Sequence, residues 1–228
     1  MTSRLLVQDL GRGPYEEVQE LQRHLCRQRI SGEISEDILL LVEHEPVVTL
    51  GRGARPGSLP LSAGDLETRG LKIFDVERGG DVTFHGPGQL VGYPIIDLRK
   101  HREDLHWYLR RLEAGLIDGL GRMGIEATTV AGLTGVWTGD RKKIASIGIH
   151  VKQWVTFHGF ALNVTTDMSY FDLIVPCGIP NVVMTSVSRE LARTDSAALW
   201  EETRTAVIGG LARQLDLEVV QDTSRTAV

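Results

Sequence analysis

The sequence predicts a single α/β (α+β) domain in which helices flank a mixed β-sheet. Short apolar runs of strand length alternate along the chain with longer segments of helical periodicity, which is the pattern of helices that pack on a sheet. The chain has 228 residues, of which 42% are hydrophobic and 24% charged, enough to bury one substantial core. No repeat, low-complexity tract or Pro-rich linker divides it, so we expect one domain over residues 1–220 and a polar tail over 221–228.

The first helix is predicted over about 14–30, after a short strand at 5–7. Pro14 suits the first turn of a helix, where its missing N–H is not needed. The apolar face of this helix recurs every three or four residues and consists of Tyr15, Val18, Leu21, Leu25 and Cys26. Cys26 is therefore expected to pack as a small hydrophobe.

Four apolar runs in the next part of the chain predict strands at 38–42, 47–50, 73–76 and 90–96. The first two are apolar on both faces, which favours central strands covered by helices. The fourth contains Pro94, which cannot donate to a strand ladder and predicts an edge strand or a bulge. Between these runs, residues 54–70 are rich in Gly, Pro and Ser and predict a surface loop.

The second half of the chain predicts two long helices and a set of consecutive strands. The helices are expected over 103–123 and 195–215, and the strands over 134–138, 143–151, 155–164 and 217–220. The last of these strands is expected at an edge of the sheet.

Composition also limits the partners and the compartment. A formal net charge of −5 argues against broad binding to nucleic acid or to a membrane surface. No apolar run approaches the roughly 20 residues that span a bilayer, and the first residues lack the pattern of a signal peptide. The two cysteines, Cys26 and Cys177, are far apart and form no CxxC pair, which fits a reducing compartment. A cytoplasmic protein is therefore expected.

A candidate nucleophile follows from Cys177 and a lysine near the start of a predicted strand. Cys177 precedes a glycine, so it can occupy a tight turn with its sulfur exposed. A thiol with the ordinary pKa of about 8.5 is only a few per cent thiolate at neutral pH, and a nearby ammonium favours the thiolate. Such a thiolate suits acyl transfer. Lys142 and Lys143 point to opposite faces of the strand, and spacing alone does not choose between them.

The glycine-dense segment 78–89 has two interpretations. Its glycines allow close backbone approach to a ligand, or they serve only the φ angles of a turn-rich loop. The segment lacks the ending of a P-loop and the spacing of a dinucleotide fingerprint, so a phosphate cradle is not supported.

Three histidines, His44, His85 and His158, could in principle bind a metal. None has a ligand spacing such as HExxH, and Cys177 has no Cys or His neighbour at a zinc spacing, so no metal site is expected. His44 and His85 are expected to be hydrogen-bonded in the core. His158 precedes Gly159 in a predicted strand, where a ligand could approach the backbone closely.

Taken together, five segments in series resemble the octanoyltransferase family of protein lipoylation. They are Glu43–Arg52 (EHEPVVTLGR), Arg78–Val91 (RGGDVTFHGPGQLV), Lys143–Gly148 (KIASIG), Phe157–Asn163 (FHGFALN) and Pro176–Gly178 (PCG). The matches fall in order between about residues 5 and 190 and cover most of the chain. Glu45 is a small departure, since family members often carry Pro there. The resemblance implies a catalytic fold shared with biotin and lipoate ligases.

The resemblance also implies roles for residues. Cys177 would accept the acyl group as a thioester, and Lys143, rather than Lys142, would be its catalytic partner. The residues implied to line the acyl pocket are Arg78, Gly79, Gly80, Asp81, Val82, Thr83, Phe84, His85, Ser146, Ile147, Gly148, Gly159, Phe160 and Ala161.

The implied activity is transfer of an octanoyl group from octanoyl-acyl carrier protein to a lysine of a lipoyl-accepting domain, the first step of endogenous protein lipoylation. Lipoyl domains of 2-oxoacid dehydrogenase complexes and the glycine cleavage H protein would be the acceptors, and no cofactor is implied. Three alternatives stay open: an ATP-dependent lipoate or octanoate ligase, an amidotransferase between lipoyl-domain proteins, and a non-catalytic module that binds the carrier or the lipoyl domain.

Overall fold

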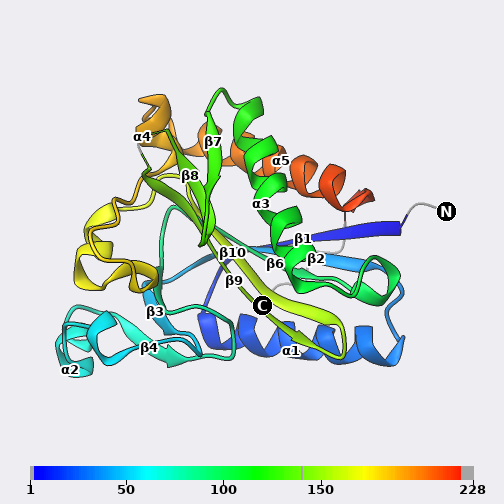
Figure 1. Ribbon diagram of the computed structural model, residues 1–228, viewed down its shortest axis with the longest axis horizontal. Helices are drawn as coiled ribbons and strands as arrows, with labels where there is room; N and C mark the ends of the chain where they lie inside the picture. Colours follow the sequence, from blue (N-terminus) through cyan, green and yellow to red (C-terminus); the bar gives the residue numbers. More distant parts are fainter. Residues whose placement is uncertain (1–2, 140, 222–228) are drawn as a thin grey trace.

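The structure is a computed structural model that describes residues 3–139 and 141–221. Its strands form two sheets (Figure 1). In spatial order, the eight strands of the larger sheet are β11 (Leu217–Gln221), β1 (Ser3–Gly13), β2 (Asp37–His44), β6 (Gln89–Ile95), β10 (Val155–Asn163), β9 (Lys143–Lys152), β8 (Leu133–Thr138) and β7 (Ala127–Val130). Those of the smaller sheet are β4 (Lys72–Asp75), β3 (Val47–Leu50) and β5 (Val82–His85).

Helices flank the larger sheet and fill the connections. The α-helices are α1 (Tyr15–Ser31), α2 (Ala63–Glu67), α3 (Leu105–Arg122), α4 (Val187–Leu191) and α5 (Ser196–Leu215). The 3₁₀-helices are η1 (Pro56–Ser58), η2 (Leu98–Lys100), η3 (Met168–Leu173) and η4 (Pro176–Gly178). The expected α/β fold, with a mixed sheet and flanking helices in a single domain, is confirmed.

The larger sheet is mixed because β1 pairs in parallel with both β2 and β11. The remaining neighbours in the spatial order, from β2 through β6, β10, β9 and β8 to β7, pair antiparallel. Helices α3 and α5 cover one face of this sheet and α1 covers the other (Figure 1). Alternate residues of β2 enter the two cores: Leu39 and Leu41 pack under α3 and α5, and Leu40 packs under α1. A strand covered on both faces reads as a continuous apolar run, as predicted.

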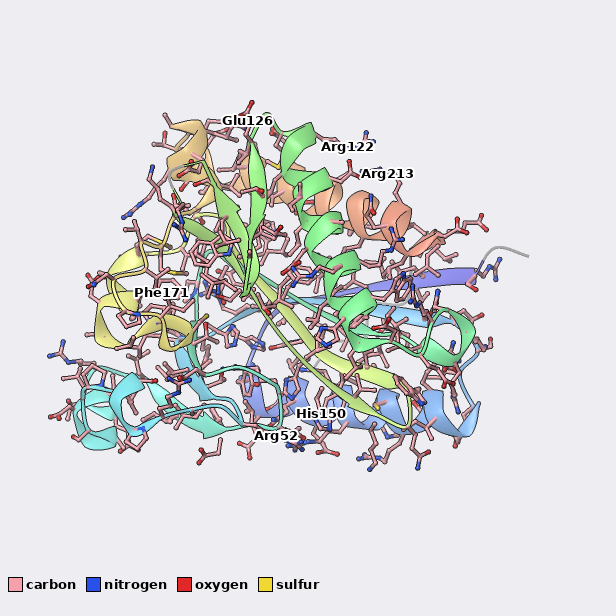
Figure 2. All side chains as sticks on the ribbon, viewed as in Figure 1. Arg52, Arg122, Glu126, His150, Phe171 and Arg213 are labelled. Carbon is pink, nitrogen blue, oxygen red and sulfur yellow. The ribbon has the colours of Figure 1, made fainter. Side chains whose placement is uncertain are left out.

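Three sequence predictions differ from the structure. The run 47–50 belongs to the second sheet, where Val48 packs against a cluster that includes Phe84 and Phe171 (Phe171 is labelled in Figure 2). The glycine-dense segment 78–89 contains strand β5, and the expected loop 54–70 contains η1 and α2. Strand β5 and helices η1 and α2 have too few residues for their periodicity to be recognised, and a short apolar run such as 47–50 does not show to which sheet it belongs.

Pro94 lies in a central strand whose pairing with β2 and β10 shows no register shift, so the prediction of an edge strand or a bulge is wrong. Strand β6 runs between β2 and β10, and its ladder with β10 stops at the pair Phe160–Gly92. Beyond that pair, His158 has φ +56°, a left-handed conformation that interrupts the ladder. Pro94 is tolerated there because the missing N–H falls where the pairing is already broken.

The ends of the chain agree with the sequence in part. Strand β11 lies at an edge of the sheet, as predicted, and Cys26 is 2% exposed in the core under α1. Strand β1 extends well beyond the predicted residues 5–7. Of the predicted tail, Gln221 ends β11 and residues 222–228 lie outside the described residues. Over residues 3–139 and 141–221, no helix combines the length and apolar character needed to cross a membrane.

Helices α3 and α5 approach closely because glycines line their contact. A Cβ on Gly119 would lie 2.9 Å from the carbonyl oxygen of Ala206, and a Cβ on Gly210 would meet the backbone of Gly115 directly. The adjacent Gly209 differs, because a Cβ there would meet the flexible Arg213 side chain at 3.1 Å. Two neighbouring glycines of one helix therefore have opposite packing requirements.

We predict that Gly210→Ala lowers the free energy of unfolding by about 1–3 kcal/mol, because the added methyl group forces two helix backbones apart. Gly209→Ala is the matched control and should raise the free energy of unfolding by up to about 1 kcal/mol through helix propensity. Urea denaturation of both variants measures this difference. Equal effects of the two substitutions would contradict the packing described for α3 and α5.

Candidate active site

Cys177 occupies a strained turn in η4. Its φ is +58°, a left-handed conformation that is uncommon outside glycine, asparagine and aspartate. The turn is closed by the N–H of Gly178, which donates to the Val175 carbonyl at 2.9 Å. The N–H of Val175 in turn donates to the carbonyl of Ser58 at 2.9 Å. The surrounding backbone thus holds the sulfur in a fixed position.

Asp81, the residue before β5, packs against the same turn. Gly178 has no room for a side chain, because a Cβ there would meet the Asp81 carboxylate directly. That carboxylate is itself fixed: Oδ2 accepts from the Ser58 hydroxyl at 2.8 Å, and Oδ1 accepts from the N–H of Val82 at 2.6 Å. Asp81 is 8% exposed, so this contact is part of the interior.

Lys143 brings its amine to the sulfur of Cys177. It is the first residue of β9, and its side chain is buried, with 1% of the residue exposed. Its Nζ lies 3.1 Å from Cys177 Sγ, 3.0 Å from the carbonyl oxygen of Thr134 and 5.1 Å from the centre of the Trp137 ring. A hydroxyl also approaches the sulfur, since Ser146 Oγ lies 3.7 Å from it.

The two lysines that the sequence left as alternatives are separated by the structure. The side chain of Lys142 is 35% exposed and its Nζ lies 3.9 Å from a carboxylate oxygen of Glu190. Lys143 points inward because its backbone pairs with the segment after η4: its N–H donates to the Val183 carbonyl at 2.7 Å. Its carbonyl accepts from the N–H of Thr185 at 3.0 Å. The structure therefore places Lys143 beside the sulfur and Lys142 at the surface.

A cavity of about 230 Å³ opens at Cys177 and Lys143 and extends between β9, β10 and the smaller sheet. Most residues that the sequence predicted for an acyl pocket line it. They are Arg78, Gly80, Asp81, Thr83, His85, Ser146, Ile147, Gly148, Gly159, Phe160 and Ala161. Segments far apart in the sequence are thus brought together around one cavity.

Three predicted pocket residues do not line the cavity. Side chains alternate along β5, so Thr83 and His85 face the cavity while Val82 and Phe84 face the core of the smaller sheet. Gly79 lies on the outer side of the loop, where its N–H donates to the Ile149 carbonyl at 2.8 Å. A motif that is continuous in sequence therefore contributes to the cavity only in part.

Several cavity residues were not assigned to the acyl pocket from the sequence. They are Tyr15, Tyr93, Gly132, Leu133, Thr134, His158 and Ile179. For His158 we did expect a ligand to approach the backbone, because it precedes a glycine in a strand. Tyr15 and Tyr93 carried no such signal, because each fits the apolar pattern of its helix or strand.

Neutral polar rings line part of the cavity: Tyr15, His85 and Tyr93 face it, and His44 packs against these three rings. Burial lowers the pKa of His44 to about 4 and lowers the pKa of His85 well below its usual range. His44 contacts the Gly13 carbonyl at 3.0 Å and the Tyr93 hydroxyl at 2.8 Å, which confirms the expected hydrogen-bonded core role. Burial also raises the pKa of Tyr15 and of Tyr93. These groups are therefore uncharged near neutral pH.

Arg78 fixes the glycine-dense loop against the smaller sheet. It is 7% exposed, and burial lowers the pKa of its guanidinium. Its Nη2 donates to the Thr49 carbonyl at 2.7 Å and to the Thr49 hydroxyl at 2.8 Å, and its Nη1 donates to the Asp81 carbonyl at 2.8 Å.

Within the described part of the chain, no group of three or more His, Cys, Asp or Glu side chains is arranged to hold a metal ion.

This arrangement provides a thiol, an amine within hydrogen-bond distance of it and an adjoining cavity of alkyl-chain dimensions. The amine can move a proton to and from the sulfur, and the cavity can bury the chain of an acyl group. The geometry suits acyl transfer through the thiol.

Known proteins resemble this chain over most of its length. The family model of the lipoyl protein ligase A/B catalytic domain matches residues 14–212. An octanoyltransferase from Solibacter usitatus is 46% identical over 221 residues, which cover 97% of each chain. An octanoyltransferase from Rubrobacter xylanophilus is 52% identical over 186 residues, which cover 80% of this chain and 82% of that one.

The fold also matches solved structures. A bipartite lipoate protein ligase from Thermoplasma acidophilum superposes with a TM-score of 0.72 at 18% identity, over 99% of this chain and 89% of that one. At that identity the similarity establishes the fold, which is the lipoate ligase fold expected from the sequence. The sequence relatives establish more: this chain belongs to the octanoyltransferase family, whose members are acyltransferases of protein lipoylation built on the lipoyl protein ligase A/B catalytic domain.

Proposed function

We propose that this enzyme transfers an octanoyl group from octanoyl-acyl carrier protein to a lysine of a lipoyl-accepting domain, through a thioester on Cys177. The observation that carries the proposal is the distance of 3.1 Å between Lys143 Nζ and Cys177 Sγ at the opening of the cavity. We assign the activity to one catalytic domain over residues 1–220. The reaction needs Cys177 as a free thiol and therefore suits a reducing compartment such as the cytoplasm.

In the first half-reaction, the Cys177 thiolate attacks the carbonyl carbon of the octanoyl thioester. The new C–S bond forms to Cys177 as the C–S bond to the carrier breaks. Lys143 accepts the proton of the Cys177 thiol and returns a proton to the departing carrier thiolate. One thioester replaces another, so the step needs no ATP.

In the second half-reaction, the amine of the acceptor lysine attacks the octanoyl-Cys177 thioester. A C–N bond forms, the C–S bond to Cys177 breaks, and the amine loses a proton. Lys143 accepts that proton and transfers it to the Cys177 thiolate, which restores the starting enzyme. An amide replaces a thioester, which makes this half downhill. Lipoyl domains of 2-oxoacid dehydrogenase complexes and the glycine cleavage H protein are the proposed acceptors.

The cavity supports an alkyl chain of moderate length. Burying about six methylenes at roughly 0.8 kcal/mol each provides about 5 kcal/mol to hold the acyl group. Phe160 and Ile147 supply apolar wall, and the neutral ring of Tyr15 also lines the cavity. Apolar and neutral groups favour an alkyl chain, because a charge facing the chain would have to lose its water.

We predict that incubation with octanoyl-acyl carrier protein, without ATP, adds one octanoyl group to the enzyme. Cys177→Ser should abolish the thioester adduct, and Lys143→Ala should slow its formation by about a hundredfold or more, because proton transfer is lost. Cys26→Ser is the matched control and should acylate like the unchanged enzyme, since Cys26 lies on the buried face of α1. Intact-protein mass spectrometry measures the adduct.

An adduct of equal yield on Cys177→Ser would contradict the proposed nucleophile. If the unchanged enzyme forms no adduct, and the lipoyl domain is acylated only when free octanoate and ATP are supplied, the protein is an ATP-dependent ligase.

We also predict that the fold loses stability as pH falls from about 6.5 towards 4. The pKa of His44 is about 4 in the folded protein and about 6.5 when unfolded, so in this window the unfolded chain binds more protons and acid favours it. His44→Gln should flatten this part of the stability curve, measured by urea denaturation at several pH values. His24→Gln, on the exposed side of α1, should leave the slope unchanged. Equal slopes in the unchanged protein and His44→Gln would contradict a neutral, buried His44.

A further inference from the structure

One peptide group, between Thr134 and Gly135, holds the amine of Lys143. The Thr134 carbonyl accepts from Lys143 Nζ at 3.0 Å. The N–H of the same peptide group belongs to Gly135, which lies in β8 with φ +130°. In a trans peptide the C=O and the N–H point in opposite directions, so what binds this N–H sets where the carbonyl points. No cis peptide bond occurs in the described residues.

The partner of that N–H is the carboxylate of Glu113, a buried residue of α3. Glu113 Oε1 accepts from the N–H of Gly135 at 3.1 Å, and the other carboxylate oxygen pairs with Arg110 on the same helix. Glu113 is 1% exposed. It lies outside the cavity and outside every segment that the sequence analysis assigned to the site.

Gly135 also touches the stem of Lys143. A Cβ on Gly135 would lie 2.7 Å from Lys143 Cε and 2.7 Å from the carbonyl oxygen of Ala145. The lysine side chain therefore lies directly against the backbone of Gly135. A displacement of this peptide group would move both the acceptor for Nζ and the surface on which the stem rests.

We propose that Glu113 is a positioning residue for the reaction, acting on Lys143 through the Thr134–Gly135 peptide group. The hydrogen bonds run in one direction, from Lys143 Nζ to the Thr134 carbonyl and from the Gly135 N–H to the carboxylate. Each bond polarises the next, and in a buried site this strengthens the chain. The carboxylate thus holds the carbonyl at the point where Nζ also reaches Cys177 Sγ.

This inference rests on the proposed role of Lys143. A purely structural role would make Glu113 a buried carboxylate that neutralises Arg110 and satisfies one backbone N–H. Arg110 does not require a carboxylate to neutralise it, because 56% of its side chain is exposed to solvent. The burial of a carboxylate is costly unless its acceptor positions are used. Here one of them is used on the peptide group that holds the lysine, which favours a positioning role.

The test is the rate at which iodoacetamide alkylates Cys177, which requires neither octanoyl substrate nor acceptor. Glu113→Asp keeps the charge but shortens the side chain. It should therefore lose the hydrogen bond from the Gly135 N–H and slow alkylation by about tenfold. Glu113→Gln keeps the length and an acceptor oxygen, and should stay within about threefold of the unchanged enzyme. If only the charge of Glu113 mattered, Glu113→Gln would slow alkylation more than Glu113→Asp.

The second part of the test repeats Glu113→Asp in a Lys143→Ala background. If Glu113 acts through Lys143, the substitution has no further effect on the alkylation rate there. Equal slowing in both backgrounds, or no slowing by Glu113→Asp in the unchanged enzyme, would overturn the proposal.

Asp118→Ala is the matched control on the same helix. Its carboxylate accepts from Arg213 at 2.7 Å and from Arg122 at 3.4 Å at the surface where α3 meets α5, and Figure 2 labels both arginines. This variant should alkylate at the unchanged rate. Failure of the proposed function would appear separately, as the absence of an octanoyl adduct on an enzyme whose alkylation rates still follow the order given above.

Discussion

The architecture of the site depends on burying one lysine amine beside one thiol. Removing a lysine head group from water costs several kcal/mol if it stays charged, unless polar partners replace the lost hydration. Lys143 is 1% exposed, and its partners are the sulfur of Cys177, the Thr134 carbonyl and the face of the Trp137 ring. These partners come from β8 and from η4, so the register of the sheet and the position of the turn are both constrained by the same amine.

The two sheets contribute different parts of the site. The larger sheet supplies Lys143 and the apolar wall on β9 and β10, and the loop that leads into β5 of the smaller sheet supplies Asp81 and Arg78. Cys177 is placed between them in a left-handed conformation, which persists because Gly178 is packed against the Asp81 carboxylate. The strain at Cys177 is thus supported by contacts of Asp81, which also lines the cavity. An acyl chain held there would lie across the junction of the sheets.

The sequence predicted the long elements and most of the residues that line the cavity beside Cys177, but it did not predict the junction of the two sheets. Strands β8, β9 and β10 and helices α1, α3 and α5 have clear periodicity and were expected close to their observed bounds. The smaller sheet was not anticipated, because β3 has only four residues and a run apolar on both faces fits either sheet. Tyr93 and Glu113 were missed for a related reason, because only tertiary contacts bring Tyr93 to the cavity and Glu113 to the Thr134–Gly135 peptide group.

The most direct test of Cys177 as the carrier of the acyl group is a single-turnover chase of isolated octanoyl-enzyme. The enzyme is acylated by octanoyl-acyl carrier protein, separated from the carrier and mixed with an apo lipoyl domain in the absence of ATP. We predict that octanoyl leaves Cys177 and appears on the acceptor lysine with the same rate constant. An adduct that persists on the enzyme, while the lipoyl domain is acylated only after carrier or ATP and octanoate are added, would contradict Cys177 as the carrier of the acyl group.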